Sequence, residues 1–268
     1  MLMLFLTLLC GLAAAVLRGF QLANSFDPRT ALIEPGDPMT VSLMALSALF
    51  AVLVVAYLFA RRGKQAPAKP LGGFWFIAEF AALFSLFAAS ALDLYTGFAN
   101  GRVSVICLGF LGLFAGGALL MIALSVNKLS FTSVTGFWAT VPVFWACLML
   151  IIEFWGHAGN PVRNSYVYGM LATVLCTLAL YAIAGSFFRK AKPGRVLLYA
   201  LSGVYFAVLT LGGALLGQWL GDPMVTLAPA SMLRLAFIAL HLSAAAVAVL
   251  YGRFTPPPKD EPEEEETA

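Results

Sequence analysis

The amino-acid sequence predicts an all-α fold, a polytopic transmembrane helix bundle with about eight spans. Hydrophobic residues make up 61% of the 268 positions, which is enough for roughly eight bilayer spans of about 20 residues. Charged residues make up 11%, where a globular protein carries about 25%, so a water-soluble domain and a nucleic-acid-binding protein are excluded. The apolar runs, such as 41–60, do not alternate between apolar and polar residues, which excludes a transmembrane β-barrel.

Eight apolar runs, each bounded by glycine, proline or charged residues, mark the spans along the chain. The first run is barely long enough to cross a bilayer, and its alanine-rich end is also typical of a signal-peptide cleavage region. No basic residue precedes this run, which favours a retained span over a cleaved signal. The predicted spans are 1–18, 39–60, 71–93, 103–126, 134–156, 165–187, 196–219 and 229–251.

Basic residues in the connecting segments predict the orientation, because loops that stay in the cytoplasm retain Lys and Arg. The opposite connections hold only four basic residues, Arg18 among them, and Arg234 lies within a span. We therefore expect a multi-pass protein of a prokaryotic plasma membrane with both termini in the cytoplasm. Alternate connections collect eleven of the 16 basic residues, namely Arg61, Arg62, Lys64, Lys69, Lys128, Arg189, Lys190, Lys192, Arg195, Arg253 and Lys259.

The chain divides into a single transmembrane domain, residues 1–251, and a C-terminal tail, residues 252–268. The tail contains consecutive prolines at 256–258 and consecutive glutamates at 263–266. This composition is too charged and proline-rich to bury a core, so we expect a disordered acidic tail on the cytoplasmic side. A solvated tail is the simplest interpretation, and a binding segment for a protein partner is the alternative.

Ionisable residues within or at the edge of the spans are the candidate binding residues: Glu79, Asp93, Glu153, Arg234 and His241. A charge in hydrocarbon is costly, so each of these side chains needs a partner. Counted from the basic end at about 1.5 Å per residue, Glu79 and His241 lie at depths of about 12 and 15 Å. On the same scale Arg234, Glu153 and Asp93 lie at about 26, 30 and 33 Å.

Helical spacing places these candidates on two faces. Arg234 and His241 are seven residues apart and share one face of span 229–251, while Glu79 and Asp93 share one face of span 71–93. If the two spans face each other, Glu79 meets His241, and Arg234 meets Asp93 or Glu153. Such pairs either line a polar pocket for a solute or only cancel the cost of burial, and both interpretations stay open.

Pro142 lies about 12 Å into span 134–156, where the loss of a backbone hydrogen bond predicts a kink. Such breaks line cavities in transporters, so Pro142 is a candidate hinge, although they also occur in helices with no function at that point. Thr173 and Thr177 lie on one stripe of span 165–187 that suits interhelical hydrogen bonds. The small-residue pairs that permit close helix contact are Gly112 with Gly116 and Gly213 with Gly217.

The few cysteines and histidines limit the possible chemistry. All four cysteines lie in apolar spans without Cys-x-x-Cys spacing, so neither a disulfide framework nor a metal site is indicated. The two histidines, His157 and His241, are too few for bis-histidine haem ligation or a histidine-rich zinc site. No nucleotide-binding or serine-hydrolase motif occurs. We predict no cofactor, no metal and no catalytic residue, and an enzyme would have to work with the buried acids and His241.

These observations favour a small-solute permease or channel-like protein of the lipid bilayer. Its polar cavity for a small solute or ion is expected between spans 71–93, 134–156 and 229–251. The alternative is a non-transporting membrane sensor or assembly subunit whose buried charges only fix the helix register. A hydrated cavity at the ionisable residues favours the first function, and direct ion pairs without a cavity favour the second.

Overall fold

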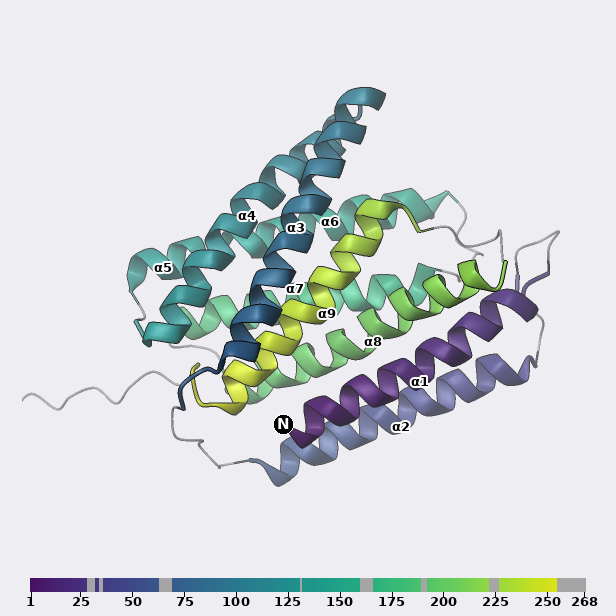
Figure 1. The fold of residues 1–268 in the computed structure, drawn as a ribbon, viewed down its shortest axis with the longest axis horizontal. Helices are drawn as coiled ribbons and strands as arrows, with labels where there is room; N and C mark the ends of the chain where they lie inside the picture. The colour runs from purple at the N-terminus through teal and green to yellow at the C-terminus, as the bar shows by residue number, and fades with distance from the viewer. Residues whose placement is uncertain are drawn as a thin grey trace, which may run out of the picture.

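The computed structural model describes residues 1–27, 32–33, 36–62, 69–130, 132–159, 166–188, 192–221 and 227–254 (Figure 1). Within these residues the chain is helical apart from turns, short connections and one bridge between Phe26 and Ile33. Its helices form eight spans that are long and apolar enough to cross a membrane, which confirms the predicted fold class. The helices are α1 (Leu2–Asn24), α2 (Pro38–Ala60), α3 (Gly73–Asn100), α4 (Val103–Lys128), α5 (Ser133–Trp138), α6 (Val141–Ala158), α7 (Val167–Phe187), α8 (Pro193–Trp219) and α9 (Pro229–Leu250).

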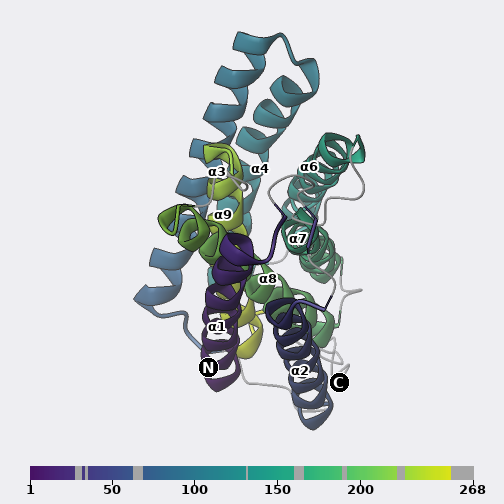
Figure 2. The same cartoon turned by 90° about the vertical axis from the view of Figure 1, so that its right-hand side faces the viewer.

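Successive spans run in alternating directions, so the start of α1 and the end of α9 lie at the same end of the bundle (Figure 1). Helix α8 is central and packs against α1, α7 and α9. Helices α3 and α4 form a hairpin that leans away from α1 and α2 and joins the rest through α9 and α6 (Figures 1 and 2). Helix α2 lies at the periphery, where its Ser47 hydroxyl is 2.9 Å from the Tyr205 hydroxyl of α8.

Two helices continue six or seven residues past the predicted ends of their spans. Helix α1 reaches Asn24 instead of residue 18, and α3 reaches Asn100 instead of residue 93. The charges at Arg18 and Asp93 do not end their helices, because both side chains are buried and bonded inside the protein. Helix α3 ends instead at Gly101, whose φ of 64° is the left-handed conformation that favours glycine at a helix C-terminus.

Span 134–156 is broken, as its proline predicts. Helix α5 ends at Trp138, and α6 begins at Val141 with Pro142 in its first turn. A first-turn proline needs no intrahelical donor, so the break lies before Pro142 and α6 is regular after it. Helix α6 carries Glu153, and its orientation relative to α5 is set by the residues between the two helices.

The basic end of the bundle is held together by backbone and arginine contacts. The Lys69 N–H donates to the Tyr251 carbonyl at 3.0 Å, which joins the segment before α3 to the end of α9. Arg253 is buried and donates to the carbonyls of Lys69, at 2.6 Å, and Asn127, at 3.0 Å. Ordered structure therefore extends through Phe254, three residues past the expected domain boundary. Residues 255–268 of the acidic tail lie outside the described residues, so their disorder stays a prediction.

Small residues let α1 and α8 approach each other closely. A Cβ atom added at Gly213 of α8 would lie 2.6 Å from the Cγ atom of Arg18, and one added at Gly19 of α1 would lie 2.6 Å from Leu216. Gly217 faces Leu22 at an ordinary contact distance of 3.4 Å. On α4, Gly112 and Gly116 face Ser90 and Phe87 of α3 in the same way. Both predicted glycine pairs therefore mark close helix contacts.

Gly213→Ala is expected to lower the unfolding temperature, because its methyl group overlaps the Arg18 stem and overpacking costs about 1–3 kcal/mol. Thermal unfolding of the detergent-purified protein measures the change. Gly117→Ala on α4 is the matched control, since no atom lies within 4 Å of the added Cβ. If both variants unfold at the wild-type temperature, the close contact of α1 with α8 does not contribute to stability.

Candidate functional site

Glu79 of α3 and His241 of α9 form a direct buried pair. The Nδ1 atom of His241 lies 2.9 Å from Oε1 and 3.2 Å from Oε2 of Glu79, and both residues are 5% exposed. Two arrangements satisfy this hydrogen bond. In one, a protonated imidazole donates to a carboxylate, and in the other, a protonated carboxyl group donates to the imidazole. Either arrangement leaves the pair without net charge, which removes most of the cost of placing it at membrane depth. The predicted meeting of these two residues is confirmed.

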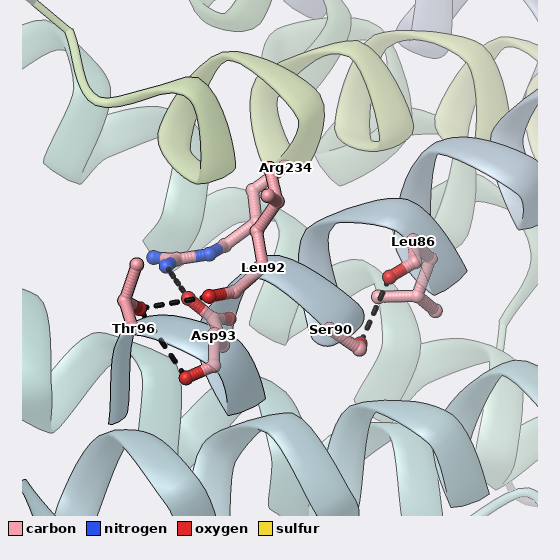
Figure 3. Close-up of polar contacts among 6 residues, drawn as sticks. All are labelled: Leu86, Ser90, Leu92, Asp93, Thr96 and Arg234. Carbon is pink, nitrogen blue, oxygen red and sulfur yellow. Dashed lines mark hydrogen bonds and ion pairs between the residues drawn. The ribbon is translucent and has the colours of Figure 1, made fainter. Parts of the chain in front are cut away.

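Arg234 and Asp93 form a second contact between the same two helices. The Nη2 atom of Arg234 donates to Oδ1 of Asp93 at 2.7 Å (Figure 3). The sequence left Asp93 and Glu153 as alternative partners, and the structure selects Asp93. The nearby hydroxyls of Ser90 and Thr96 donate to carbonyl oxygens of their own helix, so Arg234 is the partner of this carboxylate (Figure 3).

A third contact completes the α3–α9 interface. The indole Nε1 of Trp75 donates to the backbone carbonyl of Ala244 at 2.9 Å. Together with the Glu79–His241 and Asp93–Arg234 contacts, it spaces three polar bonds along two antiparallel helices. Their order fixes which turn of α3 faces which turn of α9, because any sliding of one helix past the other breaks all three.

Among the described residues, the cavity beside the Glu79–His241 pair is too small for a solute. The pocket beside Glu79 measures about 20 Å³ and is lined mainly by apolar side chains of α3 and α4. On its other side His241 stacks on Phe237, with ring centroids 5.3 Å apart. Its Nε2 atom has no hydrogen-bond partner among the described residues. The expected convergence of Glu79, His241 and Arg234 on one cavity is therefore wrong.

A polar cavity lies among α1, α6, α7, α8 and α9, and we call it the five-helix cavity. It measures about 390 Å³, and none of its lining residues comes from α3. Of the predicted site residues, Glu153 and Arg234 line it, whereas Glu79, Asp93, Pro142 and His241 do not. Its polar lining residues are Arg18, Glu153, His157, Tyr166, Thr173, Thr210, Ser231 and Arg234.

Glu153 is held in this cavity by a hydroxyl group, and no ion pair joins it to another of the described residues. The Thr173 hydroxyl donates to Oε2 of Glu153 at 2.8 Å, from the stripe of α7 that the sequence marks for interhelical hydrogen bonds. One hydroxyl satisfies a small part of a carboxylate's capacity, which is about four acceptor positions. The remaining acceptor positions of Glu153 are available to a molecule in the cavity.

Arg18 is the cavity residue that sequence reasoning missed. Because the apolar run stops at Arg18, the sequence predicts that this residue belongs to the outer connection, yet α1 continues past it and Arg18 is only 3% exposed. Its guanidinium donates to the Gln21 side chain and lies 5.1 Å from the centroid of the Tyr168 ring, a cation–π contact. The available signal was Gln21 three residues later, because i, i+3 spacing places both polar groups on one helix face.

A chain of hydrogen bonds joins Arg18 to the start of α2. The Gln21 amide donates to the Thr40 hydroxyl, and this hydroxyl and the Thr40 N–H both donate to Oδ2 of Asp37 at 2.7 Å. The Ser25 hydroxyl donates to Oδ1 of Asp37 at 2.8 Å. Asp37 is thus the N-cap of α2 and the end of the network that holds Arg18.

These hydrogen bonds alter the titration of Asp37, which lies outside the spans. Partial burial raises the pKa of the Asp37 carboxyl, but hydrogen bonds from Thr40 and Ser25 outweigh this effect and lower the pKa below its usual range. Because the folded-state pKa lies below the unfolded value of about 3.9, the stabilisation is complete above that value. It is lost as the pH falls through the folded-state pKa.

No match was found to any protein-family model, to any curated protein or to any solved structure. The function of this chain is therefore inferred from its own geometry.

Asp37→Ala is expected to lower the free energy of unfolding by about 1 kcal/mol near neutral pH, the usual cost of losing an N-cap. The difference from wild type should begin to shrink as the pH falls below about 4, where the unfolded carboxyl takes up a proton, and should be lost once the pH is below the folded-state pKa. Thermal unfolding of both proteins across this pH range measures the difference. A difference that is unchanged in acid would contradict the assignment of the stabilisation to the ionised carboxylate.

Glu79→Leu and His241→Leu are each expected to lower the free energy of unfolding by about 2–3 kcal/mol, because each leaves a buried polar group without its partner. The double variant should lose less than the sum of the two, because it removes both groups. Unfolding in increasing SDS measures all three. As a control, Glu79→Leu combined with Ser186→Ala on α7 should be additive. Additive losses in the Glu79–His241 cycle would show that the pair is not energetically coupled.

Proposed function

We propose that this chain is a small-solute permease or channel-like protein of the plasma membrane that binds its solute in the five-helix cavity. The observation that carries the proposal is a cavity of about 390 Å³ lined by two arginines, a glutamate and several hydroxyls from five membrane-depth helices. Small-molecule sites measure about 300–1,000 Å³ and place a few polar groups in an otherwise apolar wall. Ionisable residues at membrane depth are costly and mark solute pathways in transporters.

The charges around the cavity favour a solute with both a positive and a negative group. Arg18 and Arg234 present guanidinium groups, which bind carboxylates and phosphates, and Glu153 presents acceptor oxygens for an ammonium group. Asp93 already pairs with Arg234, so the surrounding charge is balanced and a dipolar solute adds none. A zwitterion such as an amino acid combines these properties in a molecule that the cavity volume can hold.

The break before Pro142 gives this proposal a mechanical element. Helix α6 carries Glu153 into the cavity, and the turn between α5 and α6 interrupts the span before Pro142. We propose that α6 tilts at this break and thereby moves Glu153 relative to the arginines of α1 and α9. The α3–α9 pair, bonded at three levels, is the fixed element against which α6 moves.

A second candidate function is a non-transporting sensor or assembly subunit. The observation that favours it is that Glu79 and His241 pair directly and away from any solute-sized cavity, as a purely structural pair does. In this alternative the acidic C-terminal tail is the contact for a protein partner. The two functions differ in whether the five-helix cavity binds a solute.

The free amino acids leucine and alanine, added as ligands, are expected to bind in the five-helix cavity and raise the unfolding temperature of the nanodisc-embedded chain. The corresponding carboxylates or amines, which carry one charge each, should raise it less. Glu153→Gln should weaken this binding about tenfold or more, because a hydrogen bond to a charged group contributes about 1.5–3 kcal/mol. Thr173→Val should weaken it less, and Thr177→Val is the matched control. Thr177 lies one turn further along α7 and outside the cavity lining.

Uptake of the same radiolabelled amino acids into proteoliposomes separates transport from binding. Binding without uptake would support the sensor. Absence of binding, or equal binding by Glu153→Gln and wild type, would exclude the five-helix cavity as a site for zwitterions.

A further inference from the structure

A second cavity lies on the lateral surface of the bundle, and we call it the α6–α8 groove. It measures about 710 Å³ and is lined by residues of α6, α7 and α8 together with Thr140 before α6 and Phe188 after α7. These residues lie where α6 and α8 begin and α7 ends, which is the basic end of the bundle. The groove shares no lining residue with the five-helix cavity.

The break between α5 and α6 explains why the groove exists. Helix α5 packs on the end of α7, where a Cβ atom added at Gly136 would lie 3.3 Å from the Phe188 ring. The chain then turns before Pro142, and α6 continues in a separate helix. Between the larger Leu178 and Tyr181 and the end of α7, the facing stretch of this helix contributes the small residues Ala182, Ala184 and Gly185 to the lining. Small residues facing a broken span leave a space that no side chain of the described residues fills.

The walls of the groove suit hydrocarbon. Phe144, Tyr181 and Phe188 line it and are 65%, 67% and 50% exposed. Large aromatic side chains with this exposure on a membrane-spanning bundle face lipid, and phenylalanine gains nothing from exposure to water. Tyr181 and Tyr199 add amphipathic rings, each with an apolar body and a polar hydroxyl group.

One end of the groove carries positive charge. Arg195, in the first turn of α8, lines the groove and is exposed, and the exposed Lys192 precedes it at the N-cap. None of the described residues that line the groove is acidic, so no carboxylate among them neutralises the Arg195 guanidinium. An arginine at the headgroup level next to apolar walls matches a molecule with an anionic head and a hydrocarbon tail.

We propose that the α6–α8 groove is a binding site for an anionic phospholipid. Its phosphate group lies against Arg195, and an acyl chain lies along Phe144, Leu178 and Tyr181. The bilayer supplies this ligand at high local concentration, and zwitterionic phospholipids lack the net negative charge that Arg195 selects. The bound lipid fills the space between α6 and α7, so it supports the position of α6. This site does not depend on solute binding in the five-helix cavity.

Native mass spectrometry of the full chain tests the proposal with phosphatidylglycerol and phosphatidylcholine of identical acyl chains. Phosphatidylglycerol should remain bound at lower lipid concentration than phosphatidylcholine. Arg195→Gln should weaken phosphatidylglycerol binding about fivefold and leave phosphatidylcholine unchanged, the effect of one basic side chain on an anionic lipid. Arg195→Lys should retain most of the binding. Phe144→Ala should weaken both lipids, because it removes acyl contacts and leaves the charge.

Arg62→Gln is the matched control, because Arg62 is exposed at the same basic end and lies outside the groove lining. It should leave phosphatidylglycerol binding as in wild type. Equal losses in Arg195→Gln and Arg62→Gln would mean a diffuse electrostatic attraction and overturn the proposal. Equal binding of the two lipids by the wild-type chain would overturn it as well, as would a stable dimer whose interface includes Phe144 and excludes lipid.

Discussion

The pairing of ionisable groups between α3 and α9 is the constraint from which most of this structure follows. A carboxylate or imidazole at membrane depth has no water to solvate it, so its partner must come from a neighbouring helix. Glu79 with His241 and Asp93 with Arg234 meet this need two helical turns apart on α9 and four turns apart on α3. Both contacts form at once only when the two helices are antiparallel and in this register. The hairpin of α3 and α4, which leans away from α1 and α2, is thereby attached to the bundle through α9 (Figure 1).

The same constraint separates structural charges from available ones. Glu79 and His241 are hydrogen-bonded to each other and surrounded by apolar side chains, so a solute that bound either one would have to displace its partner. Glu153 is satisfied differently, because its identified partner among the described residues is the Thr173 hydroxyl, which leaves most of its acceptor positions unfilled. It can therefore bind a further charged group without giving up this partner. Glu153 lines the five-helix cavity, which therefore carries the functional proposal in place of the deeper Glu79–His241 pair.

The sequence predicts the parts of this structure that depend on one helix or on one pair of helices. Run length and polarity identify the eight spans, and the seven-residue spacing of Arg234 and His241 predicts a face that meets Glu79 and Asp93. It does not predict the five-helix cavity, because that cavity depends on which spans become neighbours. Arg18 belongs to the first span and Glu153 to the fifth. The spacing of residues within either span does not predict that both side chains lie near α9 in the folded chain. The continuation of α1 past Arg18 was missed for a related reason, since the Tyr168 ring and the Gln21 network that accommodate the charge come from tertiary packing.

Helix α6 links the features that remain. It begins after a break, carries Glu153 at one end and borders the α6–α8 groove at the other. It packs mainly against α4 and α7, and it takes no part in the polar contacts between α3 and α9 that fix the rest of the bundle. Helix α6 is regular after Pro142, so Phe144 at the groove and Glu153 at the cavity lie on one continuous helix. The lipid proposed for the groove and the solute proposed for the cavity would thus contact the same helix near its opposite ends, and a change in the tilt of α6 would alter both sites.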